Sequence, residues 1–234
     1  MRYCIPFLFF LLVTGPARLP AQAADSAQTF ALDRDYRFNE GIYFSFESLA
    51  ANRPDRAWEE VNGSMVQFPD DYRVQIGGLE LLDHPTDGPL YALVLEGFPY
   101  RLVRRSAQNA LTEFVMLRIR GRLAYYEYDT TVVRPIVMRA YNPSNGIPFR
   151  EGVVEKRETV RNGRLLSFAD GRDLAFDRDN LLAIVRPRDP DLAELLRALD
   201  PRERDFEEKL RKAVKIFDDR HPLYLANPPA ADEE

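Results

Sequence analysis

The alternation of side chains along residues 112–141 constrains the fold more than any other feature of this sequence. One side of the stretch is apolar, with Val115, Leu117, Ile119, Leu123 and Tyr125, and the other is mixed, with Phe114, Met116, Arg118, Arg120, Arg122, Tyr126 and Tyr128. Alternation with a period of two is typical of a half-buried β-strand. We therefore expect a strand at the centre of a sheet, and a turn at Asp129 and Thr130 into a second strand over residues 132–141.

Shorter strands are predicted on both sides of this stretch. Runs rich in β-branched and aromatic residues, each bounded by turn residues, occur at 42–44, 73–82, 91–95, 100–104, 153–161, 164–168 and 174–176. A turn at Glu96 and Gly97 is expected to join the runs at 91–95 and 100–104 into a hairpin. Asn162 and Gly163 separate two of these runs, and Asn-Gly is the strongest short hairpin signal because a type I′ turn needs positive φ at both central residues. Gly41 permits a backbone bend before the first run. Residues 55–71 are expected to form a polar loop.

The C-terminal part of the chain changes from strand patterns to helix patterns. Asp189 is a predicted N-cap with Pro190 at the first helical position. Apolar residues three and four apart predict two amphipathic helices within about residues 189–220: Leu192, Leu195, Leu196 and Leu199 in the first, and Phe206, Leu210, Val214 and Phe217 in the second. Ser45 is expected to cap a short N-terminal helix. The predicted fold class is α+β, a mainly antiparallel, curled β-sheet with the two C-terminal helices packed on it.

The first residues have the pattern of an export signal. Arg2 precedes a short apolar stretch, and Ala21, Gln22 and Ala23 form a cleavage site of the A-x-A kind. A membrane anchor is the alternative, but a spanning helix needs about 20 apolar residues. We expect a signal peptide at residues 1–23, a single soluble domain at 24–226 with its sheet at about 36–176, and a disordered acidic tail at 227–234. The product is expected to be exported to the periplasm or the extracellular side, without a transmembrane anchor and, since Cys4 is removed, without disulfides.

Two short motifs resemble a known family. Residues 41–47 read G-I-Y-F-S-F-E, Asn52 and Pro54 follow them, and residues 221–224 read H-P-L-Y. In these motifs the chain resembles an uncharacterised family of exported bacterial proteins, in which a G-[IV]-Y-[LF]-[ST]-F-E segment opens the mature domain. In that family a sheet of short strands follows, and a helical end closes on HP-x-Y. The resemblance implies export and this order of elements, and it implies no activity, because none is established for the family.

Several catalytic chemistries lack their residues in this sequence. The only histidines, His84 and His221, lie far apart and each precedes a proline, which argues against a metal site and against a serine triad. The nucleophile-elbow, dinucleotide and Walker motifs are missing, and no cofactor is expected. Acidic residues number 37 and Lys plus Arg number 32, and the two kinds are interleaved, so no basic field for nucleic acid accumulates.

Two candidate sites remain. The first is a nominal strand face that carries Arg118, Arg120, Arg122, Tyr126 and Tyr128. Arginine and tyrosine together suit an acidic or planar partner, whereas the alternative is an exposed face neutralised by acids on a neighbouring strand, such as those in residues 155–158. The second is Glu127, a candidate catalytic acid if a pocket raises its pKa, and otherwise a solvated strand residue.

The sequence leaves three hypotheses for function. The leading one is a non-enzymatic binding or interaction module of the bacterial cell envelope, which binds another envelope protein or an acidic ligand. The second is a carboxylate-dependent hydrolase that acts on an envelope glycan or a similar polymer. The third is a structural part of a larger envelope assembly, in which the two helix stripes contact partners.

Overall fold

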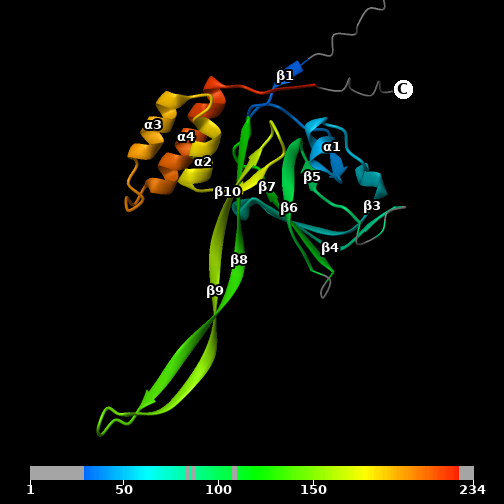
Figure 1. Cartoon of the computed structure of the whole chain (residues 1–234). Helices are drawn as coiled ribbons and strands as arrows, with labels where there is room; N and C mark the ends of the chain where they lie inside the picture. The colour runs from blue at the N-terminus through cyan, green and yellow to red at the C-terminus, as the bar shows by residue number, and fades with distance from the viewer. Residues whose placement is uncertain (1–28, 83–84, 86–87, 107–109, 227–234) are drawn as a thin grey trace, which may run out of the picture.

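The computed structural model describes residues 29–82, 85, 88–106 and 110–226 (Figure 1). Every pair of neighbouring strands is antiparallel, and helices follow the strands at the C-terminal end. The predicted α+β class is therefore confirmed. The expected signal peptide, His84 and the expected acidic tail lie outside the described residues. The description of the N-terminal segment begins at Thr29, and Leu32 in this segment is buried.

The elements follow one another in this order: β1 (Thr29–Ala31), β2 (Gly41–Tyr43), α1 (Phe46–Ala50), η1 (Trp58–Glu60), β3 (Val61–Phe68), η2 (Pro69–Asp71), β4 (Arg73–Leu81), β5 (Ala92–Leu95), β6 (Phe98–Ser106), β7 (Leu111–Met116), β8 (Leu123–Tyr141), β9 (Pro148–Ser167), β10 (Asp173–Ala175), α2 (Arg178–Val185), α3 (Pro190–Ala198), α4 (Phe206–Arg220) and β11 (Tyr224–Ala226).

Six strands form a curled sheet in the order β2-β5-β6-β7-β4-β3. The predicted hairpin of β5 and β6 is present, and its two turn residues, Glu96 and Gly97, both have positive φ, at 53° and 76°. β3 lies where a polar loop was predicted, so that prediction is wrong. Most side chains of β3 are exposed, so β3 has no apolar pattern that could be recognised in the sequence. Its position is determined instead by pairing with the edge of β4.

The prediction of one long strand through residues 112–128 is also wrong. β7 ends at Met116, and residues 117–122 form a bend before β8 begins at Leu123. Within the bend, the Arg118 amide donates to the Tyr125 carbonyl, over 2.8 Å, so the chain folds back on itself. The bend places β7 in the six-stranded sheet and β8 in a separate sheet of order β10-β9-β8.

The two predicted turns at Asp129–Thr130 and at Asn162–Gly163 are absent, since both dipeptides lie inside strands. β8 and β9 pair in continuous register from Leu123↔Ser167 to Ala140↔Arg150, so the hairpin closes only at the loop that follows Tyr141. Gly163 instead allows close packing, because a Cβ atom there would lie 3.0 Å from the Cβ of Phe176, which is a tight contact.

Three helices, rather than the two predicted, follow the strands. α2 begins after Asp177, whose side chain accepts from the Asn180 amide as an N-cap, although this segment has the composition of a turn. α3 begins as predicted, with Asp189 as N-cap and Pro190 in its first turn. The α4 stripe is confirmed by the burial of Leu210, Val214 and Phe217, whereas Leu195 of α3 is 63% exposed.

The first residues of β8 are buried on both faces. Ala124 and Tyr126 belong to a core cluster shared with β2, β5 and β7, and Leu123 and Tyr125 belong to a second cluster shared with the three C-terminal helices. A third cluster lies on the other face of the six-stranded sheet and includes Ile42, Val74 and Phe114, with Trp58 packed against it. The base of β8 and β9 therefore joins the helices to the curled sheet (Figure 1).

Candidate interaction surface

The most distinctive feature of the molecule is a β-hairpin arm, residues 129–161, that leaves the body where β8 and β9 pass beyond Tyr128 and Asn162. Figure 1 shows the arm extending away from both the helices and the curled sheet. At a rise of about 3.3 Å per residue, its β8 side is roughly 40 Å long. The three core clusters contain no residue of the arm among the residues described. The arm is therefore held together mainly by its own two strands.

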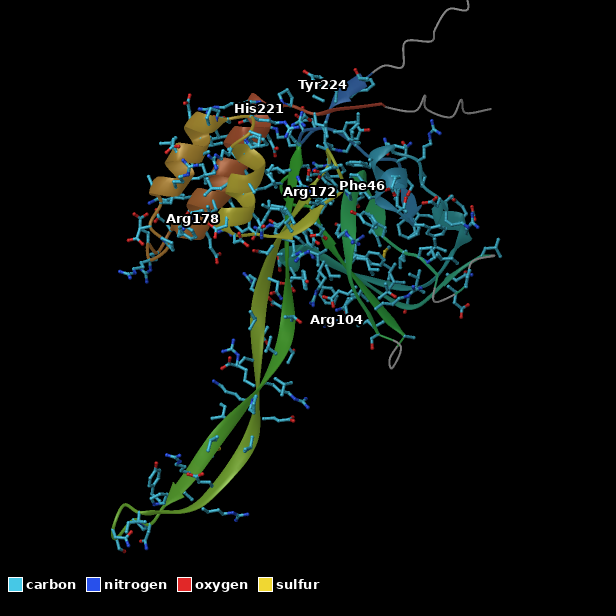
Figure 2. The ribbon with its side chains drawn as sticks, in the orientation of Figure 1. Phe46, Arg104, Arg172, Arg178, His221 and Tyr224 are labelled. Carbon is cyan, nitrogen blue, oxygen red and sulfur yellow. The ribbon has the colours of Figure 1, made fainter. Side chains whose placement is uncertain are left out.

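The arm exposes apolar side chains on both of its faces. One face carries Ile136, Val154 and Met138, and the other carries Val137, Val153 and Tyr141. Val153 is 70% exposed and Val137 is 58% exposed. In Figure 2 the side chains along the arm point outward on both sides, with no other ribbon beside them. An isolated two-stranded hairpin is only marginally stable in water, and clustered exposed apolar residues mark interaction sites.

The arm is also electrostatically different from the rest of the chain. Its charged residues are Asp129, Arg134, Arg139, Arg150, Glu151, Glu155, Lys156, Arg157, Glu158 and Arg161. Bases outnumber acids here, whereas the whole chain has a net charge of −5. The arm therefore carries charges of both signs on a body that is negative overall, and charge complementarity with a partner affects mainly the rate and specificity of association.

The arginines predicted to share one face do not share it, because all three lie in the bend between β7 and β8. Arg118 donates to Glu127 and lies over the Tyr72 ring, 4.9 Å from its centroid. Arg120 donates to the backbone carbonyls of Arg34 and Tyr36. These contacts attach the bend to neighbouring segments, so they are structural in this arrangement.

The third arginine and the two tyrosines of that predicted face also lie apart. Arg122 donates through Nε to the His221 carbonyl, over 2.9 Å, at the end of α4. Tyr126 is buried, and its hydroxyl donates to Asp173 over 2.6 Å; burial raises the pKa of this hydroxyl. Tyr128 stacks on Tyr126 with ring centroids 6.3 Å apart. The two tyrosines thus pack on the core beside β8 and do not form a binding face with the arginines.

Replacing Arg120 with serine is expected to lower the free energy of unfolding by about 2 kcal/mol, because two backbone carbonyls lose a charged donor. Chemical denaturation of the purified variant measures this loss. Arg139→Ser is the matched control, since the Arg139–Glu151 pair on the arm is exposed and contributes little. Equal stability of the two variants would contradict the structural role assigned to Arg120.

Glu127 lies at the base of the arm, and both of its carboxylate oxygens already have donors. Arg118 donates to Oε1, and the Tyr125 hydroxyl donates to Oε2 over 2.6 Å. Arg161 approaches Oε1 to 3.9 Å. A cleft of about 330 Å³ runs beside these groups. With both oxygens engaged, the Glu127 carboxylate is arranged to hold the bend against the arm.

A larger cleft, of about 590 Å³, lies between the N-terminal segment, the bend and α4. Arg118, Arg120, Lys215 and Asp218 contribute to its lining. Oδ1 of Asp218 accepts from the Leu123 amide over 2.9 Å. Its Oδ2 is buried, and it has no hydrogen-bond donor within the described part of the chain. Burial raises the pKa of the Asp218 carboxyl to about 7, and a group that titrates near neutral pH is suited to general acid–base chemistry.

Asp218 was not predicted from the sequence, because it is one of two adjacent aspartates near the end of an amphipathic helix. Its desolvation comes from the approach of the bend, where a Cβ on Gly121 would lie 2.4 Å from the Asp218 carboxyl carbon.

The arm, in contrast to Asp218, did leave a signal in the sequence. Residues 132–138 read V-V-R-P-I-V-M, with apolar residues at both parities. Such a run indicates a strand covered on both faces.

The HP-x-Y end has a structural explanation. His221 is the C-cap of α4, and its amide donates to the Phe217 carbonyl over 2.9 Å. Its ring lies near Asp189, the N-cap of α3, with Nε2 3.6 Å from Oδ2. Tyr224 follows in β11 and pairs with Ala31 of β1. The motif therefore ends the helical layer and ties the N-terminal segment to it.

Within residues 29–82, 85, 88–106 and 110–226, side chains of His, Cys, Asp and Glu do not gather into a group of three that could hold a metal ion. In the same part of the chain, the helices are too short or too polar to cross a bilayer. Comparison with known proteins found no matching family model, no matching curated protein and no matching solved structure.

Proposed function

We propose that this chain is an exported, non-enzymatic interaction module of the bacterial cell envelope that binds another protein chain through its hairpin arm. The observation that carries the proposal is the exposure of apolar side chains on both faces of an arm that the described residues of the body do not cover. Covering these side chains with a partner removes apolar surface from water, at roughly 25 cal/mol per Å². The export signal predicted at residues 1–23 is the support for the location in the cell envelope.

Photocrosslinking in cells tests this proposal directly. A photoreactive residue at Val137 or Val153 is expected to give a discrete crosslinked product. The same residue at Leu195, an exposed apolar position on α3, serves as the matched control. The expected result is a product from the arm positions and none from Leu195. Failure of both arm positions to crosslink would overturn the proposal.

Removing the arm is expected to abolish that product and to leave the body folded. Thr130 and Val160 face each other across the hairpin, so an Asn-Gly turn can join them in place of residues 131–159. Because the core clusters contain no described arm residue, the melting temperature should change by only a few degrees. Circular dichroism and thermal unfolding measure the fold, and loss of the folded body would show that the arm has a structural role instead.

A carboxylate-dependent hydrolase is the second candidate, and the specific observation in its favour is Asp218 in the 590 Å³ cleft. In that case Asp218 is the acid or base, and Lys215, which also lines the cleft, binds an anionic part of a substrate. Asp218→Asn is then expected to abolish turnover on a panel of envelope glycans and esters, with Asp191→Asn on the exposed face of α3 as control. Absence of turnover by the unmodified protein on that panel would dismiss this candidate.

A further inference from the structure

In the part of the chain that the structure describes, no strand pairs with the outer edge of β9 along the arm. Near the body this edge is occupied by β10, where the Gly163 carbonyl accepts from the Phe176 amide over 2.9 Å and the Ser167 amide donates to the Arg172 carbonyl over 2.8 Å. Backbone groups of successive strand residues point to opposite edges. The odd-numbered residues of β9 therefore point to this edge, and from Arg161 outward no described strand pairs with it.

The outer edge of β8 is different, because a proline interrupts it. The Tyr125 amide donates outward to the Ile119 carbonyl over 3.1 Å, so the odd-numbered residues of β8 point away from β9. Pro135 is one of these residues, and it has no N–H to donate. Proline on an edge strand is a known device against pairing with another chain. Of the two edges of the arm, β9 is thus the one able to accept a further strand.

The charges of β9 match those of a second β9 strand in one register. In a two-fold antiparallel pair centred on Val154, Arg150 of one copy faces Glu158 of the other, and Glu151 faces Arg157. Opposite charges directly across a strand pair are stabilising, and like charges are destabilising. We compared the two-fold registers that are centred on each residue from Glu151 to Glu158. Only the register centred on Val154 places unlike charges opposite each other and no like charges opposite each other.

The same register also aligns apolar side chains across the arm. Val154 faces Ile136 within the hairpin, and in the pair it would face Val154 of the second copy. Four β-branched side chains then form one row across a four-stranded sheet, Ile136 and Val154 from each copy. Both residues are exposed in the single chain, at 40% and 49%. We infer that the partner of the arm is a second copy of this chain, joined edge to edge along β9 around Val154.

This inference rests on the proposed function, and charge reversal tests it specifically. Arg150→Glu places two glutamates opposite each other, and Glu158→Arg places two arginines opposite each other. Each variant is expected to weaken dimerisation of the purified full chain about tenfold or more, because two attractive cross-strand pairs become repulsive. An equimolar mixture of the two variants restores both attractive pairs. Sedimentation velocity is therefore expected to show a dimer for the unmodified protein and for the mixture, and monomers for each variant alone.

Proline substitutions test the edge without changing any charge. Val153→Pro removes a donor from the outer edge of β9 and is expected to give a monomer. Val137 is its cross-strand neighbour, and Val137→Pro removes the corresponding donor from the outer edge of β8. The Val137→Pro variant is expected to remain a dimer. A dimer that is indifferent to Val153→Pro and to both charge reversals would overturn the inference.

Crosslinking separates the failure of this inference from the failure of the proposed function. A product from Val153 with twice the mass of the chain supports the second copy as partner. A product with a different protein, from a chain that is monomeric at micromolar concentrations, overturns the second-copy inference and leaves the arm as the binding element. No product from either arm position overturns both.

Discussion

Asp218→Asn is expected to remove a large pH dependence of stability. Burial raises the pKa of this carboxyl from 3.8 in the unfolded chain to about 7 in the folded one. Below pH 3.8 the group is protonated in both states and has no effect. Between pH 3.8 and 7 the unfolded state ionises first, so the free energy of unfolding falls by about 1.4 kcal/mol per pH unit. Above pH 7 the loss is complete, at about 4 kcal/mol.

The Asp218→Asn variant should not show this loss of unfolding free energy with rising pH, because an amide does not ionise. Its stability relative to the unmodified protein is therefore expected to rise by a few kcal/mol between pH 4 and pH 8. Denaturant titrations at a series of pH values measure the difference, and any constant cost of the amide cancels. Two charged neighbours shift the pKa of Asp218 in opposite directions, since Asp219 raises it and Arg122 lowers it.

Asp191→Asn is the matched control for the pH experiment, because Asp191 is exposed in the first turn of α3. Its stability curve is expected to run parallel to that of the unmodified protein. Parallel curves for Asp218→Asn as well would mean that the Asp218 carboxyl is not desolvated, and would also remove the support for the hydrolase candidate.

Gly41→Ala is expected to lower the free energy of unfolding by about 3 kcal/mol or more. Gly41 has φ of 134°, a region that residues with a Cβ rarely adopt. An added Cβ would lie 2.3 Å from the Arg56 carbonyl oxygen and 2.9 Å from the Pro54 Cβ. The Arg56 carbonyl accepts from the Ile42 amide, so relief of the clash breaks a backbone hydrogen bond at the start of β2.

Thermal and chemical unfolding measure this effect, with Gly152→Ala as the control. Gly152 lies on the arm, and none of the described atoms would come within 4 Å of its Cβ. That variant should be unchanged or slightly more stable. If Gly41→Ala were as stable as Gly152→Ala, the close approach of Gly41 to the backbone at Arg56 would not exist in the folded protein.

The local patterns of the sequence were sufficient for several elements. Glu96 and Gly97 predicted the β5–β6 hairpin, and Asp189 with Pro190 predicted the start of α3. The stripe of Leu210, Val214 and Phe217 predicted the buried face of α4. These features are a turn, an N-cap and a helical face, and in each the deciding interaction joins residues that are close together in the sequence. A local sequence pattern is therefore enough to predict them.

Other elements were decided by pairing between distant segments. Asn162 and Gly163 have the strongest turn composition in the chain, and they still lie within β9 because register with β8 continues past them. β3 has no apolar pattern and becomes a strand because β4 offers an edge. Pairing of this kind depends on which strand lies alongside, and short-range propensity is weaker than a continuous ladder of hydrogen bonds.

The sequence by itself determined the α+β class, the helical C-terminal end and the side chains that the arm carries. Only the tertiary structure decided that residues 129–161 leave the body, that Arg118, Arg120 and Arg122 contact three different segments, and that Asp218 is desolvated. The physical reason is the same in all three cases. Exposure, ion pairing and desolvation depend on the atoms that surround a side chain, and those atoms come from parts of the chain far away in sequence.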